Sequence, residues 1–258
     1  MSTHHTYNVF YYNTEIVTTV THSASVVDDW IHDVYDAFPS KLDNLIVGLD
    51  IEWRRTRTRS TRNRVAVLQL CVGRRCLIFQ FSCCDGIPKS LDVFLGNKKF
   101  IFVGVGTDSH ARKLQVDSSL EVARTEELGS LAAYKLADTF KDSSESRKFH
   151  DAKLKQLAKD VLNRELPAKD YIEWSNWGRD FLSDEQVEHA CLDAFVSYKL
   201  GVDLMKRANP KKHTSQNTNR QILRNLNKAE EGKTKQPAPL KSNGGNKTNG
   251  TNSRRTNE

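Results

Sequence analysis

The sequence contains no run of eighteen apolar residues, and this absence excludes a membrane-spanning helix. Its first residues do not combine a basic stretch with an apolar one, so we expect no secretory signal. Only five of the 258 residues are cysteines, and they lack the spacing of a zinc site. Such cysteine use favours a reducing compartment, the cytoplasm or the nucleus. We therefore expect a soluble protein that has no membrane as a partner.

The excess of positive charge is confined to the end of the chain. The formal net charge is +7, with 39 Lys and Arg against 32 Asp and Glu. Residues 208–258 hold 11 basic and three acidic residues, whereas residues 1–207 hold 28 and 29. The last fifth also lacks aromatic residues, so it buries too little apolar surface to offset chain entropy. We predict a folded domain over 1–207 and a disordered basic tail over 208–258, which is either simply solvated or a weak nucleic-acid-contacting arm.

Residues 1–207 alternate between strand-like and helix-like patterns. Two N-terminal segments rich in Val, Thr and Tyr indicate a β-hairpin, and Ser25 is a candidate N-cap for the helix that follows. The predicted strands are residues 7–12, 15–22, 45–53, 65–72, 76–81 and 100–105. The predicted helices are residues 26–38, 90–95, 108–116, 127–137, 152–162 and 183–206. This order indicates one α/β domain in which helices cover a mixed sheet.

Two carboxylates lie within one of the apolar strands, in Gly48-Leu-Asp50-Ile-Glu52-Trp53. Alternate side chains of a strand share a face, so Asp50 and Glu52 project together. Desolvation and repulsion make such a pair unfavourable unless something compensates. A hard divalent cation such as Mg²⁺ or Mn²⁺ is one compensating partner, and solvent at a strand end is the other.

A histidine and an aspartate are four residues apart in the last predicted helix. His189 and Asp193 therefore lie on one helix face. A carboxylate beside an imidazole suits metal-assisted hydrolysis, in which Asp holds an ion and His accepts a proton from water. The alternative is a surface pair with a small interaction energy.

Two further segments can contact phosphate groups. A turn with two glycines, Gly104-Val-Gly106, leads from a strand into a helix and can offer backbone N–H groups to a substrate. The loop after the acidic strand carries six arginines, a residue type whose planar fork binds phosphate. These arginines are Arg54, Arg55, Arg57, Arg59, Arg62 and Arg64. The alternative is an exposed loop without a ligand.

Taken together, these motifs resemble the Werner syndrome-like 3′–5′ exonucleases. The resemblance spans about residues 40–205 and is most specific in Leu154-Lys-Gln-Leu-Ala158, Ser175-Asn-Trp177 and Asp193-Ala-Phe-Val-Ser197. It implies a ribonuclease H-like (DnaQ-like) fold with a mixed sheet flanked by helices and a DEDD set of acids. The N-terminal hairpin and helix are also similar to the small plant members that include the RISC-interacting clearing exoribonucleases. That similarity implies a homo-oligomer, as a ring.

The resemblance also implies roles for single residues. Asp50 and Glu52 match the first two acids and Asp193 the last, which bind two Mg²⁺ or Mn²⁺ ions roughly 3.5–4 Å apart. His189 takes the place of a tyrosine found in most Werner-type relatives, and it would act as the base. His110 occupies the third-acid position. Asp108 is the nearest carboxylate and a candidate metal ligand, although on a helix it points about 200° away from His110.

Two hypotheses follow from these residues. The first is a metal-dependent 3′–5′ exonuclease that hydrolyses single-stranded RNA or DNA to nucleoside monophosphates. The second is a catalytically impaired nucleic-acid-binding or oligomeric partner subunit with the same fold, which His110 in the third-acid position favours.

Overall fold

The computed structural model describes residues 4–53, 63–140, 142–167 and 170–210. Most of the predicted disordered tail, residues 211–258, lies outside the described residues. So do five of the six arginines of the predicted phosphate-binding loop, Arg54, Arg55, Arg57, Arg59 and Arg62.

Seven strands form one mixed sheet, in the order β1-β2-β5-β4-β3-β6-β7. They are β1 (His4–Tyr11), β2 (Thr14–Thr21), β3 (Ile46–Trp53), β4 (Val65–Val72), β5 (Arg75–Gln80), β6 (Ile101–Gly104) and β7 (Thr125–Glu127). Neighbouring strands are antiparallel in β1–β2, β5–β4 and β4–β3, and parallel in β2–β5, β3–β6 and β6–β7. The predicted hairpin and mixed sheet are confirmed.

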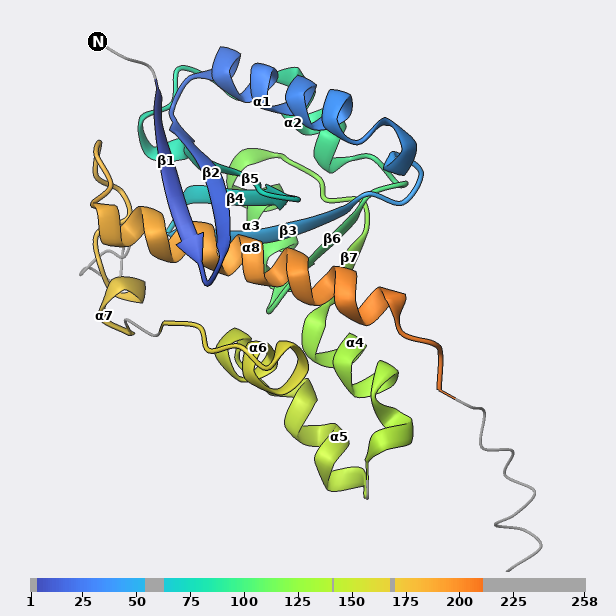
Figure 1. Cartoon of the computed structure of the whole chain (residues 1–258). Helices are drawn as coiled ribbons and strands as arrows, with labels where there is room; N and C mark the ends of the chain where they lie inside the picture. Colours follow the sequence, from blue (N-terminus) through green and yellow to red (C-terminus); the bar gives the residue numbers. More distant parts are fainter. Residues whose placement is uncertain (1–3, 54–62, 141, 168–169, 211–258) are drawn as a thin grey trace, which may run out of the picture. The chain divides into compact units, whose positions relative to one another are not determined.

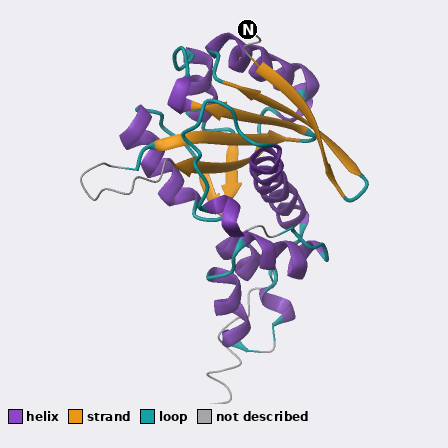
Figure 2. Cartoon of the chain, turned by 90° about the vertical axis from the view of Figure 1, so that its left-hand side faces the viewer, coloured by secondary structure: helices purple, strands orange, loops and turns teal. Residues whose placement is uncertain are grey.

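Helices cover both faces of this sheet (Figures 1 and 2). The α-helices are α1 (Ala24–Ala37), α2 (Lys89–Leu95), α3 (Thr107–Ser118), α4 (Leu128–Lys135), α5 (Ser143–His150), α6 (Leu154–Leu162), α7 (Asp170–Glu173) and α8 (Asp184–Lys206). Short 3₁₀ turns are η1 (Pro39–Lys41), η2 (Phe81–Cys83) and η3 (Ala137–Thr139). Among the described residues, no helix has the length and apolar character that a membrane crossing needs.

Two apolar cores lie on opposite faces of the sheet. One joins α1 and α2 to the buried side chains of β3 and β4, including Leu49 and Ile51. The other joins α4, α6 and α8 to the opposite face. At roughly 25 cal/mol per Å² of apolar surface, burial of this kind is the main stabilising contribution to both layers. The acids of β3 alternate with its core residues and therefore face the α8 layer.

Helix α1 begins at Ala24, two residues before the predicted start at residue 26. Its N-cap position is Ser23, whose own side chain does not cap the helix. Instead Asp85 accepts hydrogen bonds from the Ala24 N–H (2.7 Å) and the Ser23 hydroxyl (3.0 Å). The cap comes from a residue about sixty positions away, which a local sequence pattern cannot reveal. The prediction of a Ser25 cap is wrong.

Helix α8 begins near Ser183, as predicted, with a capping box: Gln186 N–H donates to the Ser183 hydroxyl, and the Gln186 amide oxygen accepts from Ser183 N–H. It then crosses β3 in direct backbone contact. A Cβ placed on Gly48 would lie 1.9 Å from the Ala194 carbonyl oxygen and 2.8 Å from Tyr198 N. Glycine at position 48 therefore sets the distance between the acidic strand and the helix that carries Asp193.

We predict that Gly48→Ala lowers the free energy of unfolding by about 3 kcal/mol, because a methyl group meets backbone atoms that cannot rotate away. Urea unfolding followed by tryptophan fluorescence measures the effect. Gly86→Ala is the matched control, since a Cβ there meets no atom within 4 Å, and a change within about 1 kcal/mol is expected. Equal stability of the Gly48 and Gly86 variants would contradict the close packing of α8 on β3.

Candidate active site

The two acids of β3, Asp50 and Glu52, belong to a largely buried cluster of polar side chains. Their side chains are 21% exposed at Asp50 and 11% at Glu52, whereas Leu49 and Ile51 pack on the opposite face. This alternation is what the strand pattern predicts. The two carboxylates are thus taken mostly out of water and kept side by side.

Helix α8 brings His189 and Asp193 against these acids. His189 Nε2 lies 3.4 Å from Asp193 Oδ2 and 3.7 Å from Glu52 Oε1. The imidazole also packs beside the fully buried Trp177, at 6.1 Å between ring centroids. Gln186 Nε2 fixes the segment before the helix by donating to Ser175 Oγ (2.9 Å) and to Asn176 O (3.2 Å). The Ser175-Asn-Trp177 motif therefore positions His189.

Helix α3 contributes His110, whose Nδ1 lies 3.3 Å from Asp50 Oδ1. Asp108, the predicted alternative ligand, is exposed, and its carboxylate accepts a hydrogen bond from the Thr125 hydroxyl at 2.6 Å. Two residues on a helix differ by about 200°, so only one of the pair can face the cluster. The structure brings His110, and not Asp108, to the acidic strand.

In the turn that leads into α3, the N–H groups of Gly106 and Thr107 are already hydrogen-bonded. Gly106 N and Thr107 N both donate to the Glu127 carboxylate, at 2.8 and 3.0 Å. The expectation that a substrate meets these groups is wrong for this conformation, because an acid from β7 already occupies them. Only the sheet topology, which places β7 next to β6, reveals this partner.

The pKa values of the three acids are raised, and burial is the largest cause for each. Burial raises the pKa of Asp50, with His110 and His189 opposing the rise. It raises the pKa of Glu52 to about 7 and that of Asp193 to about 8, and the charge of Asp50 adds to both shifts. Burial by itself lowers the pKa of His189, but contact with Glu52 and the charges of Asp193 and Asp50 outweigh it and raise the pKa to about 9.

Glu173 is a fourth acid that the sequence interpretation missed. It is exposed at the end of α7, and its charge adds to the rise in pKa of Asp50, Glu52 and Asp193. The signal was its position two residues before Ser175-Asn-Trp177, the motif that packs on His189. The site is therefore more acidic than the three predicted carboxylates indicate.

The sixth arginine of the predicted phosphate-binding loop, Arg64, is exposed beside the start of β4. The two residues that flank Arg64 contact α3. Val65 N donates to Asp117 (3.0 Å), and Lys113 contacts both Asp117 and the Asn63 carbonyl. Trp53, the last described residue before the loop, directly follows Glu52, and Asn63 and Val65 contact the helix that carries His110.

The residue types of the cluster fit a divalent cation. Three carboxylates and two imidazoles offer oxygen and nitrogen donors, and the mutual repulsion of the acids is what a cation relieves. Two imidazole nitrogens, His110 Nδ1 and His189 Nε2, have no hydrogen-bond partner within the described chain. As arranged, no three His, Cys, Asp or Glu side chains in the described ranges are placed to hold an ion. The imidazoles lie against the carboxylates instead, so a cation would compete with them.

Residues 20–209, nearly the whole described part, match the 3′–5′ exonuclease family. The chain belongs to this family. One relative is the mouse (Mus musculus) bifunctional 3′–5′ exonuclease/ATP-dependent helicase WRN, which is 32% identical over 60% of this chain and 10% of that protein. Another is an Arabidopsis thaliana 3′–5′ exonuclease, which is 30% identical over 60% of this chain and 50% of that protein. The chain thus spans half or less of the length of these two relatives.

Solved structures of the same fold include exonuclease domains. The Nibbler EXO domain of Aedes aegypti superposes with a TM-score of 0.56 at 16% identity, over 78% of this chain and 91% of that domain. RNase D of Escherichia coli gives 0.54 at 15% identity, over 72% of this chain and 44% of that protein. The predicted ribonuclease H-like fold is confirmed. The resemblance to the small plant members stays an expectation.

The raised pKa values predict that metal-free protein loses stability as the pH rises. Unfolded Asp and Glu titrate near pH 4 and unfolded His near 6.5, so between about pH 6 and 8 the folded chain binds protons that the unfolded chain releases. The melting temperature should therefore fall over this range, and it should fall less steeply in Asp50→Asn/Glu52→Gln. Thermal unfolding with a chelator present measures both slopes. A flat profile, or the same slope in both proteins, would contradict the shared titration of the cluster.

Proposed function

We propose that the chain is a metal-dependent 3′–5′ exonuclease that hydrolyses single-stranded nucleic acid to nucleoside monophosphates. The observation that carries the proposal is the convergence of Asp50, Glu52 and Asp193 with His189 in one cluster, within a chain of the 3′–5′ exonuclease family. Burial raises the pKa of all three acids, and the charge of Asp50 raises the pKa of Glu52 and Asp193 further, an unfavourable arrangement that stability alone does not explain.

Each residue has a role that its position supports. Asp50, Glu52 and Asp193 would hold Mg²⁺ or Mn²⁺, and two ions are proposed. Bound there, the cations stabilise the attacking and leaving oxygens of the phosphodiester. His189 would take the proton of the attacking water. The carboxylates that keep its pKa near 9 are the proposed ligands, so once their charge is neutralised the imidazole is free to act as a base.

His110 supports a second candidate, the catalytically impaired nucleic-acid-binding subunit. Its Nδ1 contacts Asp50 at 3.3 Å, where the resemblance places an acid, and an imidazole there contributes no negative charge to metal binding. The two candidates share the fold and the acids of β3. They differ in whether three carboxylates bind the metal tightly enough for turnover.

Exposed aromatic rings close in sequence to residues of the site support a single-stranded substrate. Tyr171 and Trp174 lie within two residues of Glu173, and Phe181 lies two residues before the cap of α8, the helix that carries His189. Their exposed fractions are 60%, 69% and 69%, which are high for large apolar side chains. Bases that are not paired stack on such rings, and the proposed contribution of Arg64 and its loop is to hold phosphates.

The catalytic assignment predicts that Asp50→Ala/Glu52→Ala lowers the rate of degradation by at least ~100-fold, and His189→Ala by ~100- to 10,000-fold. Gel analysis of 5′-labelled single-stranded RNA and DNA with Mn²⁺ measures the rates. Glu121→Ala/Asp160→Ala removes one exposed Glu and one exposed Asp elsewhere and serves as the control. Equal rates for the wild type and the Asp50/Glu52 variant would refute the assignment.

Restoring an acid at position 110 separates the two candidates. His110→Asp should strengthen Mn²⁺ binding, measured by titration calorimetry, because a carboxylate replaces a group that competes with the cation for Asp50. Asp108→Asn is the matched control and should leave binding unchanged, since Asp108 contacts Thr125. A wild type that binds oligonucleotides without degrading them, together with an active His110→Asp variant, would favour the impaired subunit.

Stacking on the exposed rings predicts weaker binding of single strands by Trp174→Ala and Phe181→Ala. Loss of one stacked base corresponds to about 1–3 kcal/mol, or roughly 5- to 150-fold in affinity. Fluorescence anisotropy of a labelled oligonucleotide, with Asp50→Ala/Glu52→Ala as the background, measures it. Tyr134→Ala is the control, because that ring is 52% exposed on α4, a helix that contributes no residue to the cluster. Unchanged affinity in both variants would exclude the stacking platform.

A further inference from the structure

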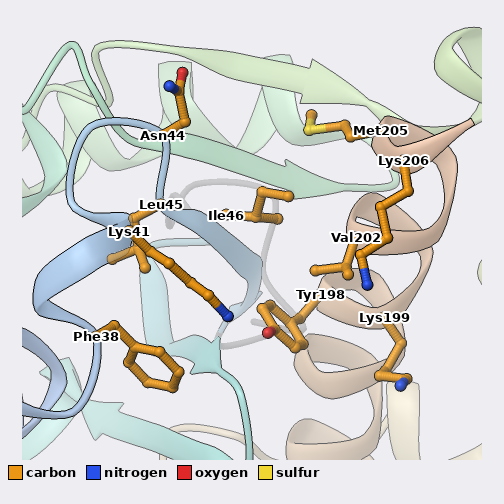
Figure 3. Close-up of a pocket in the computed structure, with 10 residues that line it drawn as sticks. All are labelled: Phe38, Lys41, Asn44, Leu45, Ile46, Tyr198, Lys199, Val202, Met205 and Lys206. Carbon is orange, nitrogen blue, oxygen red and sulfur yellow. The ribbon is translucent and has the colours of Figure 1, made fainter. Parts of the chain in front are cut away.

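A cavity lies at the N-terminal end of β3, whereas the acids lie in the second half of the strand. It has a volume of about 410 Å³, within the range of small-molecule sites. The residues that line it come from the end of α1 and from η1, from the turn into β3 and its first residue, and from the C-terminal part of α8 (Figure 3). Ile46, at its wall, precedes Glu52 by six strand residues, which corresponds to about 20 Å. The cavity is therefore separate from the carboxylate cluster.

The cavity combines an apolar wall with a basic rim. Ile46, Val202 and Met205 are partly buried along the wall, and the rings of Phe38 and Tyr198 complete it. The rim carries three lysines, Lys41, Lys199 and Lys206. In Figure 3 Lys41 ends beside the ring of Tyr198, and Lys206 extends from the other side of the cavity and ends beside Val202. None of the described residues that line the cavity is acidic.

The three ammonium groups are available to a ligand. Within the described part of the chain none of them forms an ion pair, and Lys41 Nζ lies over the Phe38 ring at 5.6 Å from its centroid. Two acids nearby in sequence are already bound by other cations. Asp43 pairs with Lys99 at 2.7 Å, and Asp203 pairs with Arg207 at 2.7 Å. The rim thus keeps an uncompensated positive charge beside an apolar wall.

We propose that this cavity binds a mononucleotide, with its phosphate at Lys41 and Lys206 and its base against the apolar wall. A phosphate dianion matches the positive charge of the rim, and a planar base matches a wall of rings and aliphatic side chains. An inorganic anion alone leaves the wall uncovered, and an apolar ligand leaves the lysines without a partner. The proposal goes beyond the nuclease function and does not depend on it.

Binding is tested with 5′-AMP, ribose 5-phosphate and inorganic phosphate as separate probes. The protein is the full chain carrying Asp50→Ala/Glu52→Ala, with a chelator present, so that the carboxylate cluster contributes neither metal nor turnover. Titration by ¹H–¹⁵N NMR gives the affinity and the location. We expect 5′-AMP to shift the amide signals of Ile46, Tyr198 and Val202 and to bind at least ~10-fold more tightly than ribose 5-phosphate.

Charge at the rim is tested by Lys41→Gln/Lys206→Gln, which should weaken 5′-AMP binding by ~10-fold or more. Lys98→Gln/Lys148→Gln removes the same charge from exposed positions elsewhere and should leave the affinity unchanged. Each of three results would overturn the proposal. They are equal affinities for 5′-AMP and ribose 5-phosphate, equal effects of the two lysine variants on the affinity, and amide signal shifts confined to the carboxylate cluster. An inactive nuclease that still binds 5′-AMP at Ile46 would support it.

Discussion

Repulsion among desolvated carboxylates is the constraint on which this molecule depends. Asp50 and Glu52 must share a face because they alternate along β3, and α8 adds Asp193 to the same place. Burial raises the pKa of all three, and the charge of Asp50 adds to the rise at Glu52 and Asp193. The imidazoles of His110 and His189 lie against these carboxylates. A fold that keeps such a cluster does so at a cost in stability, which is characteristic of functional sites.

Helix α8 makes this arrangement possible. Gly48 lets its backbone approach β3, and the Ser183–Gln186 capping box fixes where the helix starts. Gln186 also anchors the segment that holds Trp177 against His189. One half of the helix therefore positions the acidic cluster. The other half, from Tyr198 onward, forms a wall of the basic cavity, so a single rigid element connects two chemically opposite sites.

The parts of the site that follow a simple period could be predicted from the sequence. Asp50 and Glu52 follow the two-residue period of a strand, and His189 and Asp193 follow the four-residue spacing of a helix. The remaining features depend on contacts between distant segments. Asp85 caps α1 across sixty residues, Glu127 occupies the N–H groups of the turn before α3, and Glu173 approaches the cluster from α7. The short strand β7 and the polar helix α5 carry too little apolar pattern to be recognised.

Position 110 shows how geometry refines a resemblance. The sequence left either Asp108 or His110 in the third-acid position, and the helix phase decides for His110. The decisive measurement is a crystal structure after soaking in Mn²⁺, with the ion located by its anomalous signal. The account predicts manganese bound by Asp50, Glu52 and Asp193, with His189 moved out of contact with Asp193. An unoccupied cluster at saturating Mn²⁺, with His189 still paired to Asp193, would contradict it.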